Sequence, residues 1–213
     1  MTTMTLQTRV VAAGLAVAVT LLLASTEARA HEGFIPRFSV EVDAGAVSVK
    51  EEGFGTGRRY GAGVFFRTGH RMGIEVLLEN YDVAVAEGAA GLGAGRMNMT
   101  TLLVNQQLFL VTHGRVLPYG LLGIGCSFIG YAPDVPPEVE MDFVDRIALQ
   151  LGGGFDVRIS RALHVSAKAR YNMVKTWVEE LPREEPIRMT DPLAQDMLYL
   201  YGFELGLGIK FSF

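Results

Sequence analysis

The last fifteen residues constrain the fold of this chain more than any other segment. Every second side chain from Tyr199 to Phe213 is apolar, whereas the residues between them are mostly glycine, charged or hydroxyl-bearing. Successive side chains of a β-strand point to opposite faces, so this alternation predicts a strand with one apolar and one polar face. Aromatic residues stand at both ends of the apolar face: Tyr199, Tyr201, Phe203, Phe211 and Phe213. Such banding is typical of a strand that crosses a membrane, because aromatic rings favour the two interfaces.

Seven further segments alternate with the same period, namely residues 38–50, 59–67, 72–81, 97–111, 116–129, 146–159 and 163–176. A tilted strand needs about 9–11 residues to span a membrane. Tight turns are predicted at 68–71, 112–115 and 160–162, and longer polar connections at 51–58, 82–96, 131–145 and 177–196. Short turns at one end and long loops at the other are typical of outer-membrane barrels. The sequence predicts an all-β fold, an eight-stranded antiparallel up-and-down transmembrane β-barrel, in preference to one of ten strands.

The beginning of the chain carries an export signal. Arg9 precedes an apolar run over residues 10–24, and Ala28-x-Ala30 comes before the polar His31. This is the pattern of a cleaved signal peptide, and the run is shorter than the ~20 residues of a spanning helix. We therefore expect residues 1–30 to be a signal peptide and residues 31–213 to form the barrel. The barrel is expected in the bacterial outer membrane, with both termini in the periplasm.

Composition excludes several classes of function. The chain has 19 basic and 23 acidic side chains and no basic run, so we expect no nucleic-acid partner. The single cysteine, Cys126, rules out an internal disulfide and lies on an alternating apolar series that is expected to face lipid. The histidines His31, His70, His113 and His164 lack metal-ligand spacing. We assign no catalytic, cofactor-binding or metal-binding residue, and no cofactor.

Several motifs resemble the small bacterial outer-membrane barrels of the OmpA/OmpW-like group. Residues 117–125 (LPYGLLGIG) are similar to one strand of this group, and residues 148–156 with 168–171 to a pair of its strands. In this family a final strand that ends in phenylalanine, like Phe213, is read by the barrel-assembly machinery. The resemblance thus implies an assembly signal that consists of Tyr199, Tyr201, Phe203, Phe211 and Phe213. The resemblance implies passive passage of small hydrophobic molecules across the outer membrane through a lateral opening in the wall. The expected partners are outer-membrane lipid, lipopolysaccharide and the assembly machinery, and we expect a monomer.

The inward series of the predicted strands is rich in charge. Its acidic and basic residues are Glu41, Asp43, Arg67, Glu75, Glu79, Asp156, Arg158, Lys168, Arg170, Glu204 and Lys210. Side chains just fill the interior of an eight-stranded barrel, and charges there must be paired. We expect a lumen charge network that plugs the barrel; a narrow polar pathway is the alternative. A plugged lumen leaves a second function open, that of a structural or surface-interaction barrel that acts through its extracellular loops.

One pair of residues suggests an enzyme. His164 and Ser166 have the spacing of the catalytic pair in outer-membrane lipid A deacylases, which are eight-stranded barrels. His164, however, follows a predicted tight turn and lies on the inward series, away from the lipid of the outer leaflet. We therefore expect a protein that is not an enzyme, with a deacylase as a remote alternative.

The final residue yields the first prediction. Deletion of Phe213, or its change to Asp, removes the aromatic end of the strand that the assembly machinery reads. We expect the variant to accumulate unassembled, which loss of heat-modifiable migration on a gel would reveal. Phe128→Leu removes an aromatic ring from another predicted strand, keeps the chain end intact and serves as the control. Normal migration of the Phe213 variants would contradict the prediction.

Overall fold

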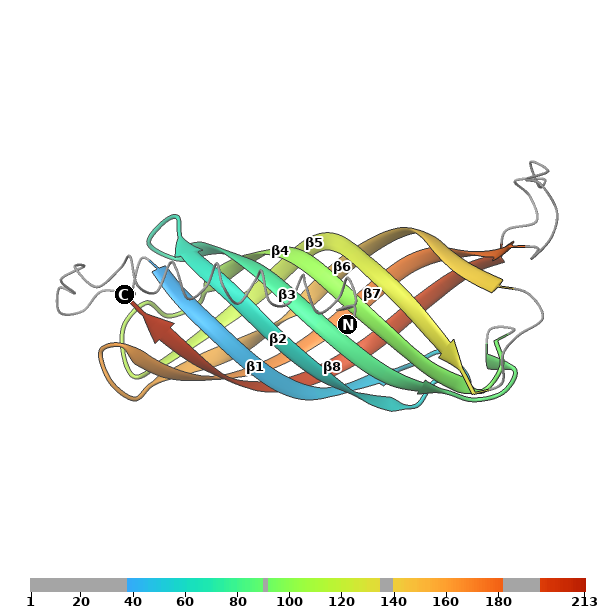
Figure 1. Cartoon of the computed structure of the whole chain (residues 1–213). Helices are drawn as coiled ribbons and strands as arrows, with labels where there is room; N and C mark the ends of the chain where they lie inside the picture. Colours follow the sequence, from blue (N-terminus) through green and yellow to red (C-terminus); the bar gives the residue numbers. More distant parts are fainter. Residues whose placement is uncertain (1–37, 90–91, 135–139, 182–195) are drawn as a thin grey trace, which may run out of the picture.

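The computed structural model describes residues 38–89, 92–134, 140–181 and 196–213, and for 140–146, 177–181 and 196–199 the backbone alone. They form eight strands: β1 (Phe38–Val49), β2 (Thr56–Arg67), β3 (Met72–Val85), β4 (Gly95–Phe109), β5 (Val116–Pro133), β6 (Glu140–Arg158), β7 (Leu163–Leu181) and β8 (Asp196–Ser212). Each strand pairs antiparallel with its chain neighbours, and β1 pairs with β8 (Figure 1). The predicted fold class and strand number are confirmed. The predicted signal peptide, residues 1–30, lies outside the described residues.

The two ends of the barrel differ (Figure 1). One end, here called the terminal end, carries Phe38, Phe213 and the short turns 68–71, 110–115 and 159–162. The opposite end, the loop end, carries the other connections. Within the described ranges, no helix is long and apolar enough to cross a membrane.

The faces of the strands alternate as the sequence predicts. On β8, Leu205 and Leu207 are 56% and 67% exposed, whereas the intervening residues face the interior. Glu204 and Lys210 are only 1% and 2% exposed. Cys126 is exposed on the outer face, as expected. Apolar residues therefore cover the outside of the barrel and charged residues are buried inside it, together with the apolar clusters described below.

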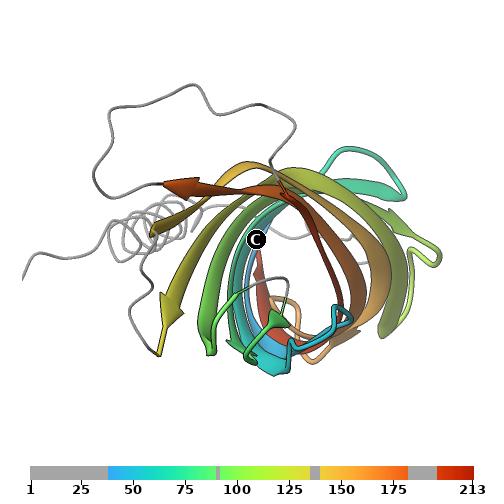
Figure 2. The same ribbon diagram turned by 90° about the vertical axis from the view of Figure 1, so that its right-hand side faces the viewer.

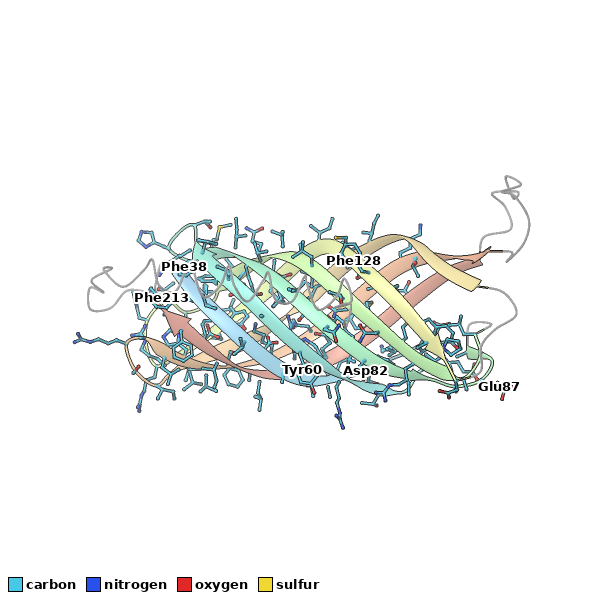
Figure 3. All side chains as sticks on the ribbon, viewed as in Figure 1. Phe38, Tyr60, Asp82, Glu87, Phe128 and Phe213 are labelled. Atoms are coloured by element: carbon cyan, nitrogen blue, oxygen red, sulfur yellow. The ribbon has the colours of Figure 1, made fainter. Side chains whose placement is uncertain are left out.

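Aromatic side chains gather toward both ends of the barrel. At the terminal end, the Phe38 ring lies 5.0 Å from that of Phe66 and 5.9 Å from that of Phe213 (Figure 3). Toward the loop end, Tyr171 of β7 stacks on Tyr201 of β8 with 6.4 Å between ring centroids. The aliphatic outer surface lies between these groups, as the aromatic banding of the last strand predicts. Of the residues in that banding, the Tyr199 side chain lies outside the described residues.

The predicted long connections are partly wrong. Strands β3, β5 and β7 continue well into the segments that the sequence analysis reads as loops, and only six residues separate β1 from β2. The polar composition of these segments misled the prediction, because a strand that rises above a membrane can expose polar side chains to water. Asp82 on β3 and Arg96 on β4 illustrate this, since they form an exposed ion pair of 2.5 Å between two strands.

The wall is interrupted at the loop end. Among the described residues, β5 pairs with β4 up to Pro133 and β6 pairs with β7 from Glu140, but β5 and β6 pair only as far as Cys126 and Ile147. The register of β6 also shifts between Val144 and Ile147, and such an irregularity bends a strand locally. Beyond this point the two strands diverge (Figures 1 and 2). This separation of residues 127–133 from 140–146 is called the β5–β6 split.

The lipid-facing surface yields the second prediction. Leu207 is the middle residue of the outward series between Phe203 and Phe211, so Leu207→Arg places a charge in hydrocarbon. We expect it to lower the free energy of unfolding in bilayers by about 2–4 kcal/mol. Ser48, an exposed residue of β1 paired with Phe203, lies nearer the interface, so Ser48→Arg should cost far less. Equal urea midpoints for the two variants would contradict this assignment of the outer face.

Candidate functional site in the barrel lumen

Aromatic and aliphatic side chains close the lumen at the terminal end. Phe65, Phe109, Leu117, Tyr119 and Leu121 form one cluster, and each is at most 3% exposed. The Phe109 ring contacts those of Phe65 and Tyr119, with centroid distances of 5.7 and 5.6 Å. These residues come from the terminal ends of β2, β4 and β5, so three strands contribute to the closure.

Lys168 and Lys210 lie just above this cluster. The Lys168 ammonium contacts carboxylate oxygens of Glu41, Asp43 and Glu75 at 2.9, 3.2 and 3.2 Å. Lys210 lies 2.6 Å from Asp156 and 3.3 Å from Glu41. All of these side chains are at most 3% exposed. The two lysines therefore link carboxylates of three strands, β1, β3 and β6, in a space without bulk water.

Arg59 is the centre of the next layer. Its Nη2 lies 2.6 Å from Asp43 Oδ1 and 2.8 Å from Glu79 Oε1, and its Nε lies 3.2 Å from Glu204 Oε2. Arg170 shares all three partners, at 2.7 Å from Glu79, 3.4 Å from Glu204 and 3.7 Å from Asp43. Two guanidinium groups thus hold three carboxylates in an arrangement that spans β1, β2, β3, β7 and β8.

Neutral side chains complete this layer. The Tyr81 hydroxyl donates to Glu79 at 2.5 Å, and the Asn172 amide donates to the Tyr81 oxygen at 2.7 Å and also to Glu204. Gln150 donates to the Asn172 oxygen at 2.8 Å. Hydrogen bonds of this kind satisfy the remaining lone pairs of buried carboxylates, without which burial of the charges would be costly.

Nine of the eleven charged residues predicted for the lumen lie in these layers, two lie elsewhere, and Arg59 is an additional member. Arg67 lies at the terminal rim, where it donates to the carbonyls of Gly69 and His70 in the adjacent turn. Arg158 lies at the same rim, paired across the sheet with His164. Arg59 was not among the predicted residues, because it was taken as the first residue of a strand and was assigned to neither face of that strand. The sequence contained the necessary pattern, since Arg59, Gly61 and Gly63 are every second residue and therefore share the inward face of the strand.

The His164 and Ser166 pair does not form a catalytic arrangement. Ser166 Oγ donates to Glu41 at 2.5 Å, and His164 Nε2 has no hydrogen-bond partner among the described residues. Both side chains are buried at the terminal end of the lumen. The geometry thus gives no support to the deacylase alternative.

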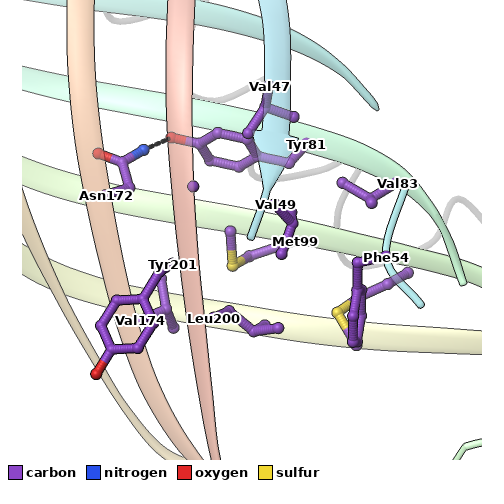
Figure 4. Close-up of a pocket in the computed structure, with 12 residues that line it drawn as sticks. Val47, Val49, Phe54, Tyr81, Val83, Met99, Asn172, Val174, Leu200 and Tyr201 are labelled. Atoms are coloured by element: carbon purple, nitrogen blue, oxygen red, sulfur yellow. Dashed lines mark hydrogen bonds between the residues drawn. The ribbon is translucent and has the colours of Figure 1, made fainter. Parts of the chain in front are cut away.

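An apolar chamber lies above the Arg59 layer, toward the loop end. It has a volume of about 30 Å³ (Figure 4). Its lining residues are Val47, Val49, Phe54, Tyr81, Val83, Met97, Met99, Asn172, Val174, Leu200, Tyr201 and Gly202. This volume holds about one or two water molecules, so a larger occupant requires its side chains to move. The unbranched Met97 and Met99 are suited to such movement.

Loop residues cover the chamber. Phe54, between β1 and β2, pairs with Val85 at the end of β3, and the Ala86 amide donates to the Gly53 carbonyl at 2.8 Å. Ala89, beyond β3, packs in the same apolar cluster. The chamber could not be predicted from the sequence, because only the pairing of five strands brings its lining residues together. Phe54 and Val83 of this lining also lie in segments that were predicted to be polar connections.

The chamber lies beside the β5–β6 split. Met99 and Met97 on β4 pair directly with Ile129 and Tyr131, which belong to the part of β5 that has left β6. Ile129 is 7% exposed and packs in the same cluster as Val174 and Leu200. Only the width of one strand therefore separates the chamber from the interruption in the wall.

The adjacent arginines of β2 yield the third prediction. Arg59→Met leaves three buried carboxylates without their shared cation, and we expect a loss of about 3–5 kcal/mol in the free energy of unfolding. Arg58→Met is the matched control, because Arg58 is exposed on the outer face and should cost little. Urea unfolding followed by fluorescence of the single tryptophan measures both. Similar stability of the two variants would show that the Arg59 layer contributes little.

Comparisons with known proteins agree with this architecture. Residues 15–211 match the family model described as "Outer membrane protein beta-barrel domain". Among solved structures, the chain is similar to Neisserial surface protein A (TM-score 0.57, 13% identity, covering 83% of this chain and 97% of that one). It is similar to OprG from Pseudomonas aeruginosa, with a TM-score of 0.57, 14% identity, and coverage of 85% of this chain and 99% of that one. It is also similar to AlkL in lipid bilayers, with a TM-score of 0.55, 14% identity, and coverage of 89% of this chain and 95% of that one. No curated protein sequence matches the chain. The family match covers most of the chain, which therefore belongs to the outer membrane protein beta-barrel domain family and resides in the outer membrane.

Proposed function

We propose that the protein is a non-enzymatic barrel that passes small hydrophobic molecules into the outer membrane by a lateral route. The molecule enters at the loop end, occupies the apolar chamber and leaves through the β5–β6 split. In this proposal the loop end faces the outside of the cell and the terminal end faces the periplasm. The observation that carries the proposal is the position of the chamber, directly above the sealed charged layers and one strand from the split.

The charged layers support a lateral route over a straight one. A solute that moves along the barrel axis must pass Arg59 and Arg170, whose side chains are at most 1% exposed and tied to carboxylates. Separating these charges without water is costly, and eight strands leave no aqueous channel. The free energy of an apolar solute falls when it leaves water for the chamber, and falls again when it enters the membrane. The route therefore favours apolar molecules and excludes ions.

The rival function is that of a structural or surface-interaction barrel. The small size of the chamber and the closed lumen favour it. The connections 135–139 and 182–195, through which such a protein would act, lie outside the described residues. Transport measurements distinguish the two functions, because a purely structural barrel carries no solute.

The fourth prediction tests the chamber. Val174 is 2% exposed inside the chamber, whereas Val165 of the same strand is 40% exposed on the outer face. We expect Val174→Trp to reduce uptake of a small apolar fluorophore to the level of cells without the barrel, and Val165→Trp to leave uptake unchanged. Cells with intact lipopolysaccharide are required, and assembled protein is matched by heat-modifiable migration. Wild-type uptake no faster than that of cells without the barrel would refute the proposed function.

A second arm of the same experiment tests the split. Phe128 is 54% exposed on the separated part of β5, and Val104 is 49% exposed on a fully paired part of β4. In a Cys126→Ala background, a bulky maleimide on Phe128→Cys should slow uptake, whereas the same label on Val104→Cys should not. Unchanged uptake with both labels would show that solutes do not leave through the split.

A further inference from the structure

Gln106 is a polar residue on the lipid-facing surface. It is exposed on β4, in the middle of the outward series Leu102, Val104, Gln106, Leu108 and Leu110. Its cross-strand neighbours are Ile74 on β3 and Leu122 on β5, which also face outward. Within the part of the chain that the structure describes, no hydrogen bond of the Gln106 side chain is found. A primary amide therefore lies inside the apolar outer surface with apolar residues on every side.

This position is unfavourable for an isolated barrel. An amide that loses water without gaining a hydrogen bond costs several kcal/mol in hydrocarbon, and lipid acyl chains offer no donor or acceptor. The glutamine side chain is also shorter than the lysine and arginine side chains that reach the interface from within a membrane. Polar side chains in membrane spans commonly hydrogen-bond across protein interfaces. Gln106 thus points to a protein partner at this face.

A depression lies next to Gln106. Gly120 on β5 pairs with Leu108 on one side and with Gly153 of β6 on the other, and both glycines belong to the outward series. A Cβ atom added at Gly153 would lie 2.7 Å from the Tyr119 carbonyl oxygen, so the wall itself requires that glycine. A Cβ atom at Gly120 would meet nothing closer than 3.9 Å. The packing of the barrel wall therefore does not require glycine at position 120. Because Gly120 has no side chain, another molecule can approach the outer surface closely at this point.

These features form a ridge and a furrow on one face. The β4 ridge consists of Val104, Gln106 and Leu108, of which the valine and leucine are 49% and 50% exposed. The glycine furrow consists of Gly120 and Gly153, one and two strands away. Small residues at a membrane interface allow two backbones to approach closely. The ridge of one barrel can therefore enter the furrow of another.

We propose that a second copy of this chain occupies this face and forms a two-fold symmetric dimer about the membrane normal. Such symmetry places the same patch on both subunits, so each ridge meets the partner's furrow. It also brings the two Gln106 amides together, and because an amide is both donor and acceptor, each one donates to the other. Lipid acyl chains offer neither group, whereas a second copy of the chain supplies both in its own Gln106. The proposal replaces the monomer expected from the sequence and does not depend on the transport route.

Cysteine crosslinking in the membrane tests the dimer. Val104→Cys with Cys126→Ala places a reporter on the β4 ridge and keeps Gln106. We expect a short bis-maleimide to yield a covalent dimer in proteoliposomes at low protein density. Leu207→Cys with Cys126→Ala is the matched control, because β8 lies on the opposite side of the closed barrel from β4. The control should give only the yield of random collisions.

Two further variants separate the dimer from chance contact. Gln106→Leu, added to the Val104 reporter, removes both amide hydrogen bonds and should weaken dimerisation about tenfold, while it favours the lipid-exposed barrel. Gly120→Leu fills the furrow and should lower the yield similarly. Heat-modifiable migration verifies that each variant is folded. A Val104 yield equal to that of Leu207, or yields unchanged by both variants, would overturn the proposal.

Discussion

The burial of charge inside the barrel is the constraint on which the rest of the structure depends. Each cation lies against two or more carboxylates from different strands, so the charged layers connect parts of the wall that are distant in sequence. Removal of one group would leave its partners charged in a space without water, and this is far more costly than the loss of an exposed ion pair. The layers therefore stabilise one register of the strands as well as closing the lumen.

Glycines of the inward series make room for these charges. A Cβ atom at Gly206 would lie 2.6 Å from Arg59 Nη1, and one at Gly61 would lie 3.2 Å from its Nη2. Larger residues at these positions would displace the guanidinium from its carboxylates. The abundance of glycine in the strands thus has a specific physical cause, since an eight-stranded interior is too narrow for large side chains from every strand.

The barrel is sealed along its axis and interrupted in its wall. The aromatic cluster and the charged layers close the terminal half, whereas the apolar chamber and the β5–β6 split lie toward the loop end. The proposed lateral passage uses this difference. The Gln106 face, by contrast, lies on the fully paired part of β4 and suits contact with a second barrel, so the two proposals concern separate regions.

The alternation of single residues determined much of this structure. Because side chains of a strand alternate between two faces and a membrane reverses the usual preference for polar exposure, the series from Tyr199 to Phe213 was enough to predict a spanning strand. The same reasoning predicted the closed eight-stranded barrel and the outward position of Cys126. It also placed charges such as Glu79 and Lys168 in the lumen before any contact was known.

Only the tertiary structure decided how these residues meet. The partners of Arg59 come from three other strands, and the alternation of one segment contains no information on the stagger that aligns them. The chamber combines residues of five strands that are far apart in sequence with Phe54 and Val83, which lie in segments that resemble polar loops. The β5–β6 split depends on where pairing ends, since beyond Cys126 and Ile147 β5 pairs only with β4 and β6 only with β7 among the described residues. Such properties arise from pairing between segments, so no single segment of the sequence could reveal them.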